Sequence, residues 1–87
     1  FMNIIKLIAI TKKKLETSII IEDLKIEDKS FLHQNHSGND PNKFHLKLTI
    51  KSNELKKMNR IESNKKIYDI LSDEMKKYIH SLQILIT

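Results

Sequence analysis

The chain has 87 residues, a formal net charge of +5 and no cysteine. This length allows one domain with a modest core, and the lack of cysteine excludes a disulfide framework and any thiolate ligand from the chain itself. With 39% hydrophobic and 31% charged residues, the composition is that of a globular domain. We therefore expect residues 1–87 to form a single domain, with most of the lysines on a solvated surface.

The chain begins with the apolar run FMNIIKLIAI, which predicts a helix over about the first fifteen residues. This run has roughly half the length that a membrane-spanning helix needs. Basic residues follow the apolar run and do not precede it, unlike the layout of a secretory signal peptide. Residues 19–21 are compatible with the end of this helix or with the beginning of a strand.

Two later segments alternate apolar and polar residues, which is typical of half-buried strands. The first is DLKIED, residues 23–28, and the second is FHLKLTIKS, residues 44–52. Residues 29–43 between them contain the single Gly and the single Pro, and we expect a long loop there. His33 and His36 fall in this loop. The polar face of the second strand is expected to meet water or a partner.

A helix and a third strand complete the predicted fold. Asn59, with Glu62 three residues later, is typical of a helix N-cap with a capping box. Apolar residues then recur at helical spacing: Ile61, Ile67, Ile70, Leu71, Met75 and Tyr78. In SLQILI, residues 81–86, the apolar side chains of Leu82, Ile84 and Ile86 alternate as in a strand. His80 lies at the junction.

This order predicts an α+β fold with the elements α-β-β-α-β. The first two strands are expected to pair as an antiparallel hairpin, and the helix between the last two is expected to cross over to a parallel neighbour. The sequence thus predicts a three-stranded mixed sheet with helices packed on one face.

Four segments in this order resemble the BolA family over roughly residues 24–86. They are DKSFLH at 28–33, HLKLTIKSNEL at 45–55, IESNKKIYDILSDEM at 61–75 and IHSL at 79–82. The family pattern has Asp-x-Ser-x-x-His, a glycine-containing loop, His-Phe-x-Val-x-Ile-x-Ser-x-x-Phe, an Arg-His-Arg stretch and a closing His-Ala-Leu. The chain departs from it where Ser63, Asn64 and Lys65 replace Arg-His-Arg, where Lys57 replaces a Gly, and where Leu46 and Leu55 replace Phe.

The resemblance implies a KH-like, type II-like domain without the Gly-x-x-Gly loop of nucleic-acid-binding KH domains. It also implies a non-enzymatic adaptor that is a monomer alone and forms a heterodimer with a monothiol glutaredoxin. In such complexes the glutaredoxin and its glutathione supply thiolates to a shared [2Fe-2S] cluster. The BolA-like partner supplies a His from the end of the long helix and a loop His or Cys. No cofactor is expected for the isolated protein.

On this basis His80 is the first predicted ligand, and His33 occupies the loop-ligand position of the family. His36 and His45 are alternatives, and imidazole is a suitable ligand for iron. The residues predicted to contact the partner lie on the helix and just after it: Lys65, Lys66, Tyr78, Ile79, Ser81 and Leu82.

Other functions remain open from the sequence. The four histidines could gather around zinc, although structural zinc sites usually include Cys. A KH-like transcriptional regulator is the alternative function, because basic residues cluster near the helix start: Lys56, Lys57, Arg60, Lys65 and Lys66. Catalysis is not expected, since Ser30 and Ser63 have no evident base nearby. The expected location is the mitochondrion in a eukaryote and the cytoplasm in a bacterium.

Overall fold

The computed structural model describes residues 1–30 and 43–87. The elements are α1 (Ile4–Ser18), β1 (Asp23–Asp28), β2 (Phe44–Lys51), α2 (Asn53–Lys56), α3 (Arg60–Ile70), α4 (Ser72–Lys77) and β3 (Ile79–Ile86). Both predicted hairpin strands are confirmed. Residues 19–21 belong to neither the first helix nor a strand, because Ile19 is the C-cap of α1. The predicted loop at 29–43 lies largely outside the described residues.

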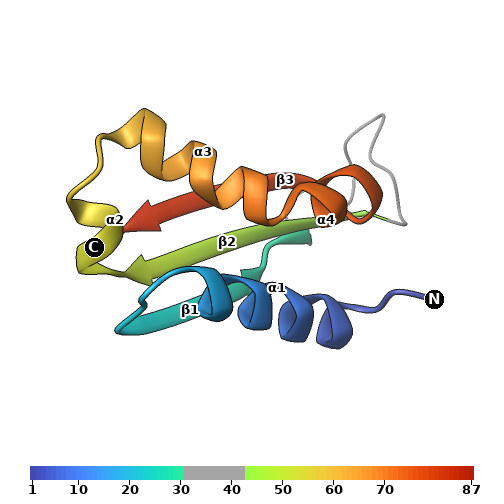
Figure 1. Cartoon of the computed structure of the whole chain (residues 1–87). Coiled ribbons are helices and arrows are strands. Elements are labelled where there is room, and N and C mark those ends of the chain that lie inside the picture. The colour runs from blue at the N-terminus through green and yellow to red at the C-terminus, as the bar shows by residue number, and fades with distance from the viewer. Residues whose placement is uncertain (31–42) are drawn as a thin grey trace.

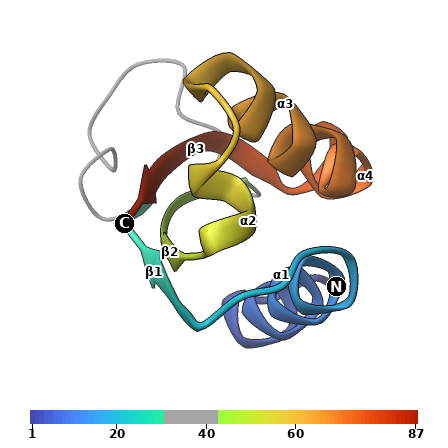
Figure 2. The same ribbon diagram turned by 60° about the vertical axis from the view of Figure 1, so that its left-hand side comes forward.

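The sheet has the order β1-β2-β3, with β1 antiparallel to β2 and β2 parallel to β3. The helices between β2 and β3 form the crossover, as the sequence predicted. In Figures 1 and 2 the helices lie on one face of the sheet, with α1 beside β1 and α3 beside β3. The predicted α+β architecture with a mixed three-stranded sheet is therefore confirmed.

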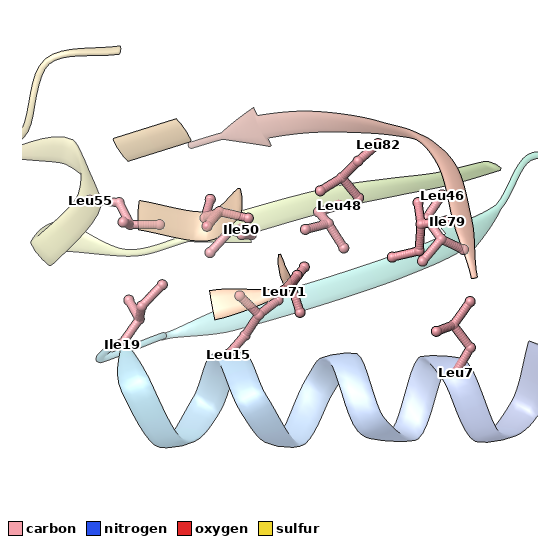
Figure 3. Packing of buried hydrophobic residues seen from close by; sticks show 11 residues of the cluster. Leu7, Leu15, Ile19, Leu46, Leu48, Ile50, Leu55, Leu71, Ile79 and Leu82 are labelled. Atoms are coloured by element: carbon pink, nitrogen blue, oxygen red, sulfur yellow. The ribbon is translucent and has the colours of Figure 1, made fainter. Parts of the chain in front are cut away.

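The hydrophobic core lies between the sheet and these helices (Figure 3). The side chains of Leu7 and Leu15 on α1, and of Ile19 at its C-cap, point toward the sheet. The other buried apolar residues come from β2, β3 and the crossover: Leu46, Leu48, Ile50, Leu55, Ile67, Leu71, Ile79 and Leu82. Burying a side chain of this size contributes about 1.5–3 kcal/mol, so this cluster dominates the stability of the domain.

The predicted long helix begins where expected but is interrupted. The side chain of Asn59 accepts a hydrogen bond from the Glu62 N–H at 2.8 Å and also donates to the Glu62 carboxylate. At Leu71 the backbone leaves helical geometry, with ψ of 19°, and α4 begins at the next residue. The periodicity of the sequence crosses this point without a signal, so one predicted helix is in fact two.

One residue assigned to the apolar face of this helix was placed wrongly. Ile61 is 80% exposed, whereas Ser63 and Ile67 are the buried residues of α3. Successive residues of an α-helix are about 100° apart, so Ile61 lies far around the helix from both of them. The first turn therefore presents Ile61 to solvent.

Among the described residues, no helix is long and apolar enough to span a membrane.

Candidate metal-binding site

Strand β3 begins with an irregularity that determines the position of His80. Phe44 pairs with Ile79, but the next residue of β2, His45, pairs with Ser81. His80 is thus an extra residue on β3, as in a β-bulge, and bulges re-aim side chains. Ile79 and Leu82 are buried, whereas the two residues between them are both exposed. His80 and Ser81 therefore share the face of the sheet opposite the helices.

The bulge brings His80 against His45. The two imidazole rings are stacked, with centroids 5.0 Å apart and an interplanar angle of 26°. His45 Nδ1 is hydrogen-bonded to the Ser81 hydroxyl at 2.6 Å. The side chain of His80 is exposed, but His45 is only 5% exposed. We call His45 and His80 the histidine pair: one ring is buried and fixed, and the other is open to a partner.

The backbone of His45 is held as firmly as its ring. Its N–H donates to the Ser30 hydroxyl at 3.1 Å, and its carbonyl accepts from the Lys29 N–H at 2.7 Å. These contacts hold the residues that follow β1 against the start of β2, the central strand of the sheet. The polar face of β2 was expected to meet water or a partner, and at His45 it is instead covered.

Basic residues dominate the charge of the sheet near this site. The Lys29 ammonium lies 3.3 Å from a Glu27 carboxylate oxygen, and Lys25 lies 3.7 Å from the same atom. The hydrogen bond from Lys29 is the main cause that lowers the pKa of Glu27, and the charges of Lys25 and Lys47 act in the same direction. Glu27 therefore stays ionised and engaged with lysines.

The structure brings together only some of the predicted ligands. His80 and His45 lie side by side, whereas His33 and His36 fall outside the described residues. Within residues 1–30 and 43–87, no three His, Cys, Asp or Glu side chains form a cluster that could hold a metal ion. The described residues thus offer an imidazole pair and no complete set of metal ligands.

The residues predicted to contact a partner are scattered, and two of them need correction. Ile79 is 2% exposed and Leu82 is 9% exposed, so both are core residues and not surface contacts. Ile79 and Leu82 both point into the core because the bulge places two exposed residues, His80 and Ser81, between them. Ser81 binds His45, and Tyr78 is half-buried against the core.

The two predicted lysines lie on α3, away from the histidine pair. Lys66 forms an ion pair with Glu54 of α2 at 2.9 Å, and Lys65 pairs with Asp69 at 3.0 Å. Helix α2 follows the C-terminal end of β2, whereas His80 lies near the beginning of β3, at the opposite end of the sheet (Figure 1). The structure does not join these lysines and His80 into one surface.

Sequence reasoning missed the bulge and the role of Ser81. A signal was present, because the pair His80-Ser81 between Ile79 and Leu82 breaks the strict alternation of a strand. Two consecutive polar residues flanked by apolar ones are compatible with a bulge at that point. What the pattern could not show is that the displaced side chain stacks on His45, which lies on a different strand.

Comparisons with known proteins identify the family of this fold. The chain matches the family model described as BolA-like protein over residues 15–87, and it belongs to this family. A solved structure of the BolA domain of SufE1 from Arabidopsis thaliana superposes with a TM-score of 0.78 at 28% identity. That likeness covers 100% of this chain and 94% of the solved one. The family resemblance drawn from the sequence motifs is confirmed.

Two curated relatives carry different names. The chain is 32% identical over 79 residues to SufE-like protein 1, chloroplastic/mitochondrial, of Arabidopsis thaliana, covering 85% of this chain. It spans 21% of the length of that relative. It is also 28% identical over 75 residues to the DNA-binding transcriptional regulator BolA of Haemophilus influenzae, covering 86% of this chain and 70% of the relative.

Proposed function

We propose that this BolA-like domain is a non-enzymatic adaptor that binds a monothiol glutaredoxin and shares a [2Fe-2S] cluster with it through His80. The observation that carries the proposal is the exposed His80 imidazole, fixed at a strand bulge and stacked on a buried His45. A ligand on a strand is held more precisely than one on a loop, which favours a defined cluster geometry.

The donor set of the chain fits a shared cluster better than a resident one. Imidazole ligates one iron of some [2Fe-2S] centres, but such centres also need thiolates. This chain has no cysteine, and the described residues contain no cluster of three potential ligands. In this proposal the thiolates therefore come from the partner, and the cluster is transferred cargo and not a resident cofactor of this chain.

We assign His45 a positioning role and not ligation. Its ring is buried, and its Nδ1 is already hydrogen-bonded to Ser81, so it supports His80 from behind. Stacking restricts the rotation of the His80 ring about its side-chain bonds. This arrangement explains why a polar residue is buried at the start of a sheet.

The second ligand in this proposal is His33, with His36 as its alternative. Both lie outside the described residues, and the choice remains a prediction from the sequence. Ser30, the last described residue before His33, accepts a hydrogen bond from the His45 N–H and therefore lies beside the histidine pair. The variants His33→Ala, His36→Ala and the double change distinguish the two: loss of cluster stability is expected with His33→Ala or only with the double change.

The decisive experiment mixes the chain with a cluster-loaded monothiol glutaredoxin and follows visible absorption and circular dichroism. The wild-type chain is expected to change the spectrum of the cluster, and His80→Ala is expected to abolish that change. Gln83→Ala is the matched control, because Gln83 is exposed on the same strand. An unaltered spectral change with His80→Ala would disprove ligation by His80.

NMR titration with the same glutaredoxin maps the contact surface. Shifts are expected around His80, Ser81 and the exposed Lys76 and Lys77 that end α4. Lys65 is expected to be unaffected, since it lies outside this region. Shifts spread evenly over the surface would argue against a specific glutaredoxin interface.

A transcriptional role is the second candidate, supported by the name of the Haemophilus relative. In this chain the exposed Lys56, Lys57 and Arg60 are the positive charges available near α2 and α3. Binding that rests on them should fall steeply with salt and weaken further in Lys57→Glu. We expect weak, non-specific binding, and tight sequence-selective binding at physiological salt would favour this role instead.

For location, we propose the mitochondrion if the chain is eukaryotic and the cytoplasm if it is bacterial. The support is the name of one relative, which includes chloroplastic/mitochondrial. Imaging of the full-length protein with a C-terminal fluorescent tag tests this, and a nuclear signal would contradict it.

A further inference from the structure

A second surface lies at the far end of β3 from the histidine pair. A groove of about 460 Å³ runs between the α2–α3 corner and the C-terminal half of β3. Its apolar lining includes Leu55, Met58, Ile84 and Ile86, and its polar rim includes Lys56 and Arg60. In Figure 2, the start of α3 stands beside β3 at this end of the sheet.

The groove exposes main-chain groups at the edge of the sheet. β3 is an edge strand, and the Thr87 N–H donates to the Ile50 carbonyl of β2 at 2.8 Å. Successive residues of a strand direct these groups to opposite sides, so the N–H and C=O of Ile86 and Ile84 point away from β2. The same alternation turns the Leu82 carbonyl outward, and there it accepts from the Tyr68 hydroxyl at 3.2 Å.

This edge is covered at Leu82 and open further along. In the described part of the chain, no group is hydrogen-bonded to the outward main-chain groups of Ile84 or Ile86. Exposed edges of this kind pair readily with an additional strand. The ligand that fits such an edge is an extended peptide, because its own N–H and C=O groups repeat at the same spacing.

The charge of the rim indicates the side chains of that peptide. Lys65 and Lys66 on α3 are paired with Asp69 and Glu54, whereas Lys56 and Arg60 form no ion pair with any described residue. The net charge at the groove is therefore positive. An acidic residue of a peptide on β3 would come within reach of Arg60 and Lys56.

The corner beside the groove is poorly suited to bind phosphates. The N–H of Lys57 donates to the Asn53 carbonyl at 3.2 Å, and that of Met58 donates to the Leu55 carbonyl at 3.1 Å. The first turn of α3 also carries the Glu62 carboxylate, already bound to Asn59. No aromatic side chain is among the described residues that line the groove. Both the phosphate contacts and the base stacking of nucleic-acid binding are thus unfavourable here.

We propose that an extended acidic segment of a partner protein binds this groove as a fourth strand, hydrogen-bonded to Ile84 and Ile86 and ion-paired with Arg60 and Lys56. A second copy of this chain is disfavoured as the occupant, because a protein with a net charge of +5 would bring like charges to the rim. The site is separate from the histidine pair, so the two proposals stand or fall independently.

The test uses the 87-residue chain and a soluble decapeptide of alternating glutamate and valine, without glutaredoxin or cluster. NMR titration is expected to shift the Ile84 and Ile86 amides, and hydrogen exchange of these two amides should slow. The same peptide with N-methyl groups along its pairing edge should not bind. Equal binding of the methylated peptide would overturn strand addition.

Charge variants test the rim. Arg60→Glu is expected to weaken peptide binding by about fivefold to tenfold. It should fold, since an acidic residue in the first turn of a helix suits the helix dipole. Lys12→Glu is the matched control, because it changes the net charge equally at an exposed position of α1. Equal weakening by both variants would show a non-specific charge effect and overturn the proposed rim contact.

Two competitors test the other occupants. Ten-residue single-stranded oligothymidylate is expected neither to shift these amides nor to displace the peptide. Displacement of the peptide would assign the groove to nucleic acid. Concentration-dependent shifts of Ile84 and Ile86 in the chain alone would assign it to a second copy. Either result overturns the proposal.

Discussion

The two ends of β3 differ in which of their chemical groups are exposed. At the beginning, a bulge turns the His80 and Ser81 side chains outward while the strand itself stays paired with β2. At the end, the side chains of Ile84 and Ile86 pack toward the core, and no described residue is hydrogen-bonded to their outward main-chain groups.

This difference is the reason why the two proposals assign different kinds of recognition to one edge strand. Side-chain chemistry requires that a residue be held in one orientation, and the stacked His45 with its Ser81 hydrogen bond provides this. Main-chain recognition requires only an unpaired edge and a complementary charge.

The largest expected effect is on the free energy of unfolding, and it distinguishes a core residue from a candidate ligand at the beginning of β3. Ile79→Ala should destabilise the domain by about 2–5 kcal/mol, since it removes a side chain that is 2% exposed in the core. The adjacent His80→Ala should cost no more than about 0.5 kcal/mol, because His80 is exposed. Urea unfolding measures both. Leu85→Ala, 47% exposed on the same strand, is the control with a small expected loss.

The next effect concerns the support of α4, which leads into the bulge. Glu74 has only 7% side-chain exposure, and Lys14 of α1 is bonded to it at 2.8 Å. Lys14→Met would leave this carboxylate covered and unpaired, at a cost of about 1–3 kcal/mol in the free energy of unfolding. Lys13→Met is the control at an exposed position. Equal stability of the two variants would show that the pair contributes nothing.

The same pair also gives a dependence on alkaline pH. Its hydrogen bond with Glu74 is the main cause that raises the pKa of Lys14 above 10.5. Because this pKa is raised in the folded state, the Lys14 ammonium contributes its full stabilisation below pH 10.5. The contribution is lost as the pH rises through the higher pKa of the folded state. Thermal unfolding of wild type and Lys14→Met should therefore converge at strongly alkaline pH, and a constant difference would contradict this.

A smaller effect is expected where Ser81 fixes the His45 ring. Ser81→Ala removes the hydroxyl bound to Nδ1 and should destabilise by about 1 kcal/mol. The more specific readout is the ¹⁵N spectrum of the His45 ring, whose tautomer balance should change. Gln83→Ala, exposed on the same face, should leave that spectrum as it is. An unchanged His45 spectrum in Ser81→Ala would disprove the positioning role of the hydroxyl.

The smallest expected effect is on stability at α2, near the C-terminal end of β3. The hydrogen bond from Lys66 is the largest cause that lowers the pKa of Glu54, followed by that from the Ile20 N–H. Because this pKa is lowered in the folded state, the ionised Glu54 carboxylate stabilises the fold above pH 4.5. The contribution is lost as the pH falls through the lower pKa of the folded state. Glu54→Gln should therefore be less stable than wild type at pH 7, with the difference vanishing at strongly acidic pH.

Thermal unfolding at several pH values measures this change. Glu16→Gln on α1 is the control, since Glu16 is exposed and bonded to no described residue. If Glu16→Gln and Glu54→Gln respond alike, the contact between α2 and Lys66 has no measurable effect on stability.

The sequence by itself determined the elements whose pattern is local. Alternation alone located β1 and β2 to within a residue, and the cap at Asn59 located the start of α3. The parallel pairing of β2 and β3 followed from a helical crossover between them. Family motifs then pointed to His80 before any geometry was available.

Only the tertiary structure decided which of these residues share a surface. The bulge depends on the register between Phe44 and Ile79, which are far apart in the chain, and that register buries Ile79 and Leu82 while stacking His80 on His45. The ion pair that neutralises Lys66 and the position of β3 at the edge of the three-stranded sheet also arise from packing between distant segments. Periodicity describes a segment relative to its own axis, and it carries no information on which other segment lies beside it.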